Sequence, residues 1–105
     1  MASILVILLS ILPPDEAQMT ARVAAEYGLS REQTILLAAI RKEENGGPGL
    51  EFGVGQERKG HRARRFKNAP ARSFVTQARW AAGTIAKHYD GDLAAFASRY
   101  CPKNA

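Results

Sequence analysis

The chain is poor in the residues that build metal and redox sites. It has one cysteine, Cys101, and two histidines, His61 and His88, among its 105 residues. A single cysteine cannot form an intrachain disulfide, and neither histidine stands at a recognised metal-ligand spacing from it. We therefore predict no structural metal and no redox role, and we treat Cys101 as a small apolar side chain.

Long hydrophobic runs are also absent. The most apolar stretch, Ile4 to Leu12, is well short of the roughly 20 residues that span a bilayer, and two prolines follow it. No Lys or Arg precedes it, whereas an export signal has a basic flank. We predict that residues 1–14 form an apolar helix packed on a domain of residues 15–105. A degenerate export signal is the alternative.

The composition otherwise matches a folded domain. Hydrophobic residues make up 46% of the chain and charged residues 24%, and a chain of this length has room for one core. The positive charge is concentrated in residues 58–67, which contain six Lys or Arg and no acid, so removing them changes the net charge from +5 to −1. Such a segment is either a patch for an anionic partner or a solvated loop.

Helix signals begin directly after the two prolines. Residues 15–27 start with acids and stop at Gly28, which is typical of a helix. Ser30 and Gln33 have the spacing of a capping box, which predicts a next helix that runs to about Glu44. Its segment 35–40 (ILLAAI) is apolar around nearly the whole circumference, so we expect it to be the central buried helix.

Asn45 to Gly49, with three glycines and a proline, ends that helix. The following residues 50–70 have weak periodicity and high charge, which predicts one long loop or a short hairpin near 52–56. Ser73 has the character of an N-cap, so we expect a helix from there to about His88, and Gly91-Asp92 should begin a last one. The predicted core positions of the first of these helices are Phe74, Ala78, Ala81, Ala82 and Ile85. The predicted fold class is mainly α.

Two adjacent carboxylates, Glu43 and Glu44, end the apolar helix beside the glycine-rich turn. Burial in an apolar pocket would raise the pKa of a carboxyl there and make it a proton donor, and the partial negative charge of the helix C-terminus acts in the same direction. The alternative is that both acids are solvated and pair with Arg41 or Lys42. Helical periodicity does not decide which glutamate matters.

Residues 39–45 (AIRKEEN) resemble the motif Ala-Ile-x-Arg-Gln-Glu-Ser of bacterial lytic transglycosylases, which belong to the lysozyme-like superfamily. The resemblance implies a small lysozyme-like helical domain whose catalytic acid is Glu44. Lys42, Glu43 and Asn45 stand at the Arg, Gln and Ser positions of the motif. Chains similar to this one continue past Cys101, which implies that a terminal helix is missing.

Further segments extend the resemblance in the same order along the chain. Residues 53–56 (GVGQ) resemble Gly-Leu-Met-Gln, which lines the cleft beside the acid, and 93–97 (LAAFA) resemble the Ala-Ala-Tyr-Asn motif. Phe96 stands at the tyrosine of that motif, and Tyr100, one turn later, can supply the phenolic hydroxyl. Phe52 is added because it lies in the loop and aromatic faces stack on pyranose rings. The expected substrate-binding residues are Phe52, Gly53, Val54, Gln56, Phe96 and Tyr100.

The resemblance also implies a reaction. Enzymes of this superfamily cleave the β-1,4 bond between N-acetylmuramic acid and N-acetylglucosamine in peptidoglycan, with a glutamate as general acid and base. No second carboxylate matches a family position, which favours lytic transglycosylation over lysozyme-type hydrolysis. Neither reaction requires a metal or an organic cofactor. The expected partner is a glycan strand at the bacterial cell envelope or in a phage particle, and residues 58–67 would contact anionic envelope polymers.

Two other functions stay open on the sequence. One is a catalytically inactive lysozyme-like module with a structural or binding role, because a fold alone does not determine activity. The other is a basic helical nucleic-acid-binding protein, since residues 27–30 (YGLS) are typical of the turn in a helix-turn-helix. The helix after that turn offers few polar groups to base edges, which argues against nucleic acid as a partner.

Overall fold

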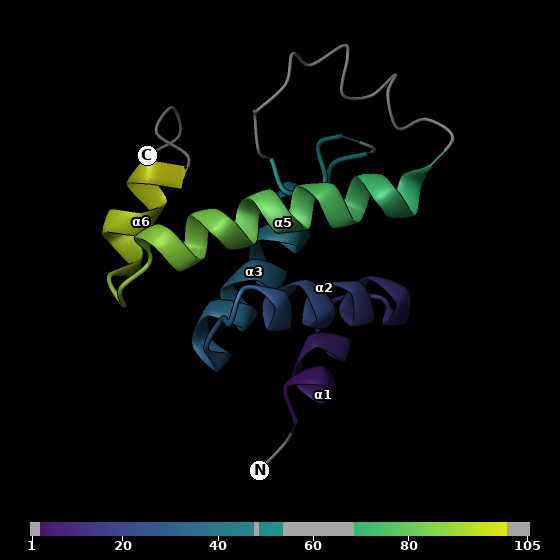
Figure 1. Cartoon of the computed structure of the whole chain (residues 1–105), viewed down its shortest axis with the longest axis horizontal. Helices are drawn as coiled ribbons and strands as arrows, with labels where there is room; N and C mark the ends of the chain where they lie inside the picture. Colours follow the sequence, from purple (N-terminus) through teal and green to yellow (C-terminus); the bar gives the residue numbers. More distant parts are fainter. Residues whose placement is uncertain (1–2, 48, 54–68, 101–105) are drawn as a thin grey trace.

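The computed structural model describes residues 3–47, 49–53 and 69–100, and all regular structure within them is helical (Figure 1). The prediction of a mainly α fold is confirmed. The helices of these residues are α1 (Ile4–Leu9), α2 (Pro14–Glu26), α3 (Arg31–Glu44), α5 (Pro70–His88) and α6 (Leu93–Tyr100).

Local sequence sets the ends of α2. Pro14 occupies its first turn, where the missing N–H costs nothing, and Asp15 and Glu16 follow it beside the positive end of the helix dipole. Tyr27 is the C-cap, and Gly28 then takes φ +62°, a left-handed conformation that glycine adopts without strain. The predicted helix over residues 15–27 is therefore present.

The predicted capping box of α3 is confirmed. The Gln33 N–H donates to the Ser30 hydroxyl over 3.1 Å, and the Ser30 N–H donates to the Gln33 side-chain oxygen over 2.9 Å. At the other end, the helix stops at Glu44 because Asn45 turns into the left-handed region at φ 45°. Asparagine is one of the few residues other than glycine that adopt this conformation readily.

The start of α5 differs from our prediction. Ser73 was expected to cap this helix, but the helix begins at Pro70 with Ala69 as its N-cap. The reason is that proline is preorganised for the first helical turn, so it begins the helix without a side-chain cap. Ser73 is instead fully buried inside the helix, facing the turn that follows α3.

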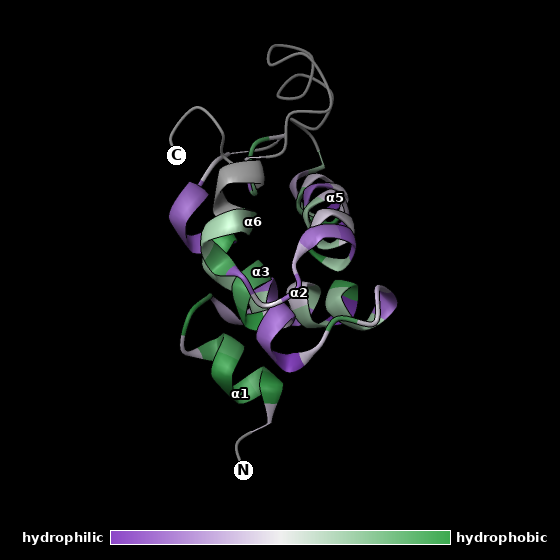
Figure 2. Ribbon diagram, turned by 90° about the vertical axis from the view of Figure 1, so that its left-hand side faces the viewer, coloured by the Kyte–Doolittle hydropathy of each residue, from purple (hydrophilic) through white to green (hydrophobic). Residues whose placement is uncertain are grey.

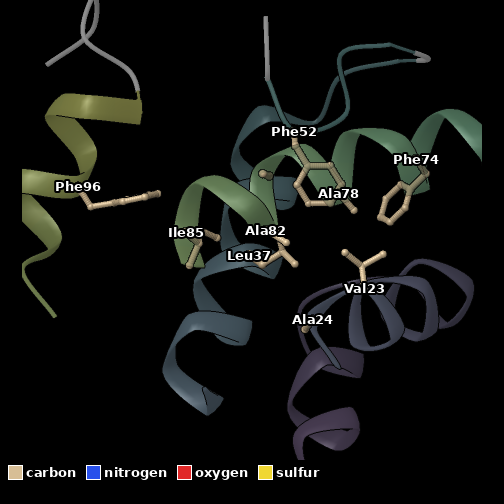
Figure 3. Packing of buried hydrophobic residues seen from close by; sticks show 10 residues of the cluster. Val23, Ala24, Leu37, Phe52, Phe74, Ala78, Ala82, Ile85 and Phe96 are labelled. Atoms are coloured by element: carbon tan, nitrogen blue, oxygen red, sulfur yellow. The ribbon is translucent and has the colours of Figure 1, made fainter. Parts of the chain in front are cut away.

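Helices α2 and α3 lie between α1 on one side and α5 on the other (Figures 1 and 2). Between α2, α3 and α5 lies the main hydrophobic core, into which Phe52 and Phe74 point (Figure 3). Their rings meet edge to face with centroids 5.1 Å apart. The five core positions predicted on α5 are all buried. Helix α3 contacts α1, α2 and α5, but only three of its residues are buried: Thr34, Leu37 and Ala38.

Helix α1 packs through a separate, smaller cluster, and Figure 2 shows it as an apolar segment against α2 and α3. Leu8 and Leu12 are buried there against Ala17 of α2 and Ala38 of α3. The large side chains of this cluster thus come from the N-terminal segment, whereas α2 and α3 present alanines. None of the helices in the described residues is both long enough and apolar enough to cross a bilayer.

Helix α6 begins at the predicted place. Asp92 caps it, because its carboxylate accepts the N–H of Ala95 over 3.0 Å. Phe96 packs edge to face on Tyr89 with ring centroids 5.6 Å apart, which attaches α6 to the end of α5. The Tyr89 carbonyl accepts a hydrogen bond from the Gln33 side chain, so this end of the molecule also holds the start of α3.

Candidate active site

Glu44 is the last residue of α3, and its carboxylate lies against the backbone of Gly53. A Cβ atom added to Gly53 would be 2.6 Å from Glu44 Oε1 and 2.7 Å from Glu44 Cδ. Real Cβ atoms do not approach other atoms this closely, and Gly53 also has φ +68°. The position of the carboxylate therefore depends on the missing side chain at residue 53. Two residues named from the sequence are therefore in contact in the fold.

The surroundings of Glu44 differ from our expectation. We expected an apolar pocket around the acid, but both Glu44 and Glu43 are exposed. The buried residues Leu37 and Ala38 lie one to two turns before these acids, which are the last two residues of α3. The protein interior does not supply the desolvation that we expected at Glu44.

The turn that carries the chain from Glu44 to Gly53 is narrow. Gly46 faces Leu50 so closely that a Cβ on Gly46 would lie 2.1 Å from the Leu50 carbonyl oxygen. Only glycine fits at this position, because the conflict is with backbone and cannot be relieved by a rotamer change. The glycine-rich sequence that ends α3 is thus also the sequence that lets the chain fold back toward it.

Helix α5 fixes the far side of this turn. The Gly49 N–H lies 2.6 Å from the Ser73 hydroxyl and 3.0 Å from the Glu51 carboxylate, and both oxygens accept from it. The Phe52 N–H donates to Gln77 over 3.2 Å. Ser73 and Gln77 are buried among apolar residues of α5, where a polar group without a partner would be costly. These contacts hold the residues just before Gly53 on a rigid helix.

Arg41 fixes the near side of the turn. Its guanidinium forms a bidentate ion pair with Glu16 of α2, with Nε–Oε1 2.8 Å and Nη2–Oε2 3.1 Å. Its Nη1 donates to the carbonyls of Gly46 over 3.1 Å and Glu51 over 3.4 Å. The guanidinium carbon lies 5.4 Å from the centroid of the Phe74 ring. Arg41 therefore joins α2, α3, the turn and α5.

A groove of about 300 Å³ lies beside this arginine. It is lined by Arg41, by Asp15 and Glu16 of α2, by the turn after α3 and by the first residues of α5. Glu44 does not line it. No cluster of three His, Cys, Asp or Glu side chains that could hold a metal ion occurs among the residues the structure describes.

Two of the expected substrate-binding residues have a different role in the structure. Phe52 is fully buried in the main core, and Phe96 is buried against Tyr89, so neither ring has a free face for stacking on a sugar. Phe52 was expected to be accessible because it lies in a loop. It is buried because the turn folds back onto α5, where Phe74 provides an aromatic partner.

The remaining expected residues fall outside the described part of the chain. Residues 54–68 lie outside the described part of the chain, and they include Val54, Gln56 and the basic segment 58–67. Most of the hairpin predicted near 52–56 lies there too, and residues 51 and 52, at its start, form a turn. Tyr100 is the last residue of α6, and its side chain is also outside the description.

Sequence reasoning did not find Arg41, Glu16, Ser73 and Gln77 as site residues. Glu16 and Arg41 are 25 positions apart, and each had a local explanation as a helix-end charge. Ser73 and Gln77 are polar residues on a helix whose apolar residues were used to predict its buried face. The available signal was the spacing of Ser73, Gln77 and the apolar positions Phe74 and Ala78, which places all four on one helix face.

Comparisons with protein-family models, with curated proteins and with solved structures find no match to this chain.

Proposed function

We propose that this protein cleaves the β-1,4 glycosidic bond between N-acetylmuramic acid and N-acetylglucosamine in peptidoglycan, with Glu44 as general acid and base. The observation that carries the proposal is the contact between the Glu44 carboxylate and Gly53. The motif resemblance pairs these two positions as the acid and the first residue of the segment beside it, and the fold brings them together across the turn.

The exposure of Glu44 fits a polymeric substrate. An exposed carboxylate at the end of a helix is accessible to a glycan strand that lies across the surface, whereas a buried one would need an opening. The desolvation that strengthens acid catalysis must then come from the bound sugar rings, which exclude water when they cover the carboxylate. The side of the carboxylate that faces Gly53 is in contact with its backbone, so a sugar ring approaches the acid from the exposed side.

The reaction needs one carboxyl group in two protonation states. Protonated Glu44 gives its proton to the glycosidic oxygen as the bond to the muramyl anomeric carbon breaks, and the N-acetylglucosamine end leaves with a new hydroxyl. The Glu44 carboxylate then takes the proton of the muramyl hydroxyl that attacks the same carbon and closes the anhydro ring. This step returns Glu44 to its protonated form and consumes no water.

The test compares Glu44→Gln with Glu43→Gln. Both variants lose one exposed carboxylate from the last turn of α3, so they have the same change in charge. We expect Glu44→Gln to lower turnover on purified peptidoglycan by about 10²–10⁴-fold because glutamine has no proton to give. Glu43→Gln should retain most of the activity, since glutamine is the residue of the motif at that position.

Mass spectrometry of the released muropeptides reads out the reaction type. Anhydro ends support transglycosylation, and reducing ends indicate hydrolysis. A larger loss in Glu43→Gln than in Glu44→Gln would show that the other carboxylate is the acid. Absence of any product with the folded unmodified protein would refute the proposed activity.

A further inference from the structure

The ion pair between Arg41 and Glu16 lies beside the contact between Glu44 and Gly53 and can affect its geometry. It joins α2 to the C-terminal end of α3 with two parallel hydrogen bonds, a geometry that fixes both side chains in orientation as well as distance. The side chains of Arg41 and Glu16 are 12% and 21% exposed, so water screens the pair only weakly.

The other hydrogen bonds of Arg41 reach the backbone close to Glu44 and close to Gly53. The Gly46 carbonyl is two residues beyond Glu44, and the Glu51 carbonyl is two residues before Gly53. The Arg41 guanidinium therefore holds the backbone just after Glu44 and just before Gly53. A shift of Arg41 would be transmitted to both sides of the contact, because the intervening turn is closed by the backbone approach of Gly46 to Leu50.

We infer that Arg41, oriented by Glu16, is a positioning residue that holds the Glu44 carboxylate on Gly53. This inference rests on the proposed function for its catalytic consequence, but its structural part, the dependence of the contact on the ion pair, stands on the geometry alone. Arg41 contacts carbonyl groups and a carboxylate of the protein itself, so its effect on a reaction is indirect.

The chain offers a matched control for this ion pair. Arg79 of α5 and Glu26 of α2 form a second bidentate pair, with Nε–Oε1 3.0 Å and Nη2–Oε2 3.1 Å. The two pairs have the same residue types and the same geometry, and each starts from α2. The second pair is much more exposed, with side chains 49% and 39% accessible, and its two hydrogen bonds join α2 to α5.

The experiment measures the site directly by NMR and then by kinetics. Glu16→Gln removes the charge that orients Arg41 but keeps an oxygen that can accept a hydrogen bond, and Glu26→Gln makes the same change in the control pair. We expect Glu16→Gln to move the backbone amide resonance of Gly53 and the side-chain carboxyl resonance of Glu44. Glu26→Gln should leave both resonances where they are in the unmodified protein.

On peptidoglycan, the kinetic parameters separate positioning from binding. We expect Glu16→Gln to lower kcat by roughly 10–100-fold, as displacement of a reacting group does, with KM nearly unchanged. In the Gly53→Ala background the same substitution should have little further effect, because the contact that the ion pair holds is already broken. Circular dichroism at the assay temperature verifies that each variant is folded. Arg41→Lys, which keeps the positive charge but loses the bidentate geometry, serves if Glu16→Gln does not fold, and it should give the same pattern.

The outcomes distinguish this inference from the proposed function. Unchanged Gly53 and Glu44 resonances in a folded Glu16→Gln variant would overturn the inference. So would moved resonances with an unchanged kcat in a protein that cleaves peptidoglycan. Moved resonances in a protein that cleaves nothing would support the structural part and refute the proposed function instead.

Discussion

Two glycines of this chain have nearly the same backbone conformation and different surroundings. Gly53 has φ +68° and Gly28 has φ +62°, and both are exposed. A Cβ at Gly53 would meet the Glu44 carboxylate, whereas a Cβ at Gly28 would have no heavy atom within 4 Å apart from its chain neighbours. Alanine substitutions at these two positions therefore separate the effect of backbone strain from the effect of moving the acid.

The magnitudes follow from the geometry. A left-handed conformation costs an alanine about 1–2 kcal/mol, so both variants should lose a similar amount of folding free energy. At Gly53 the added Cβ would be 2.6 Å from Glu44 Oε1, whereas ordinary contact begins at 3.4 Å, so the carboxylate must move by roughly 1 Å. The end of a glutamate side chain can make this movement at little cost in stability. A displacement of this size costs a reacting group on the order of 10²-fold in rate.

The assay is turnover of purified peptidoglycan by Gly53→Ala and Gly28→Ala, with urea unfolding of both proteins. We expect similar losses of stability and a loss of activity in Gly53→Ala alone. Equal activity of the two variants would show that the contact of Glu44 with Gly53 is not needed for the reaction. A much larger loss of stability in Gly53→Ala would show that the carboxylate does not move aside, and the activity could then not be compared.

Two further predictions concern stability and titration. Thr20 of α2 is fully buried, and its hydroxyl has no hydrogen-bond partner among the described residues. Thr20→Val keeps the shape of the side chain, so it should stabilise the protein by about 1 kcal/mol and raise Tm by about 4–8 °C in calorimetry. A lower Tm would show that the hydroxyl has a hydrogen-bond partner. The pKa of Tyr89 is raised above 10.0, first because its hydroxyl donates to the Glu32 carboxylate and also because of burial and the charge of Glu32. The stabilisation from this bond is therefore present below about pH 10 and is lost as the pH rises through the raised pKa. Glu32→Gln should lower the pKa of Tyr89 in an ultraviolet titration corrected with Tyr89→Phe, and an unchanged titration would contradict this cause.

The parts of the fold that could be predicted from the sequence depend on interactions within a few residues. Ser30 and Gln33 cap α3 as expected because each satisfies the backbone N–H of the other. Gly28 ends α2, and Asp92 begins α6, for reasons equally local. The apolar positions of α5 were also predictable, because a periodic stripe on a helix this long has one way to be buried.

The errors arose where tertiary contacts override a local preference. Ser73 has the side chain of an N-cap, but Pro70 starts the helix earlier and Ser73 binds the Gly49 backbone from inside it. Phe52 was placed in a cleft because it lies in a loop, but the ring of Phe74 and the bond to Gln77 draw it into the core. Pro70 was a local signal for the start of α5, whereas the partners of Phe52 are distant in sequence, so no local pattern could have revealed its burial.

In the candidate site, Glu44 and Gly53 were named from a motif. The ion pair of Arg41 with Glu16 is seen only in the fold. A partly buried ion pair across 25 residues leaves no periodic or spacing signal, because each charge alone has the pattern of an ordinary charge at a helix end.

The small cluster between α1 and helices α2 and α3 has large side chains on one side and small ones on the other. This difference determines what would be exposed if α1 detached. If the residues after α1 moved with it, Leu8 and Leu12 would leave, and the alanines Ala17 and Ala38 would remain on α2 and α3. A methyl group exposes little apolar area, so the open scaffold would be nearly as resistant to self-association as the closed one. The exposed apolar surface would then be on the released segment, which could bind another apolar surface while the rest of the protein exposed little.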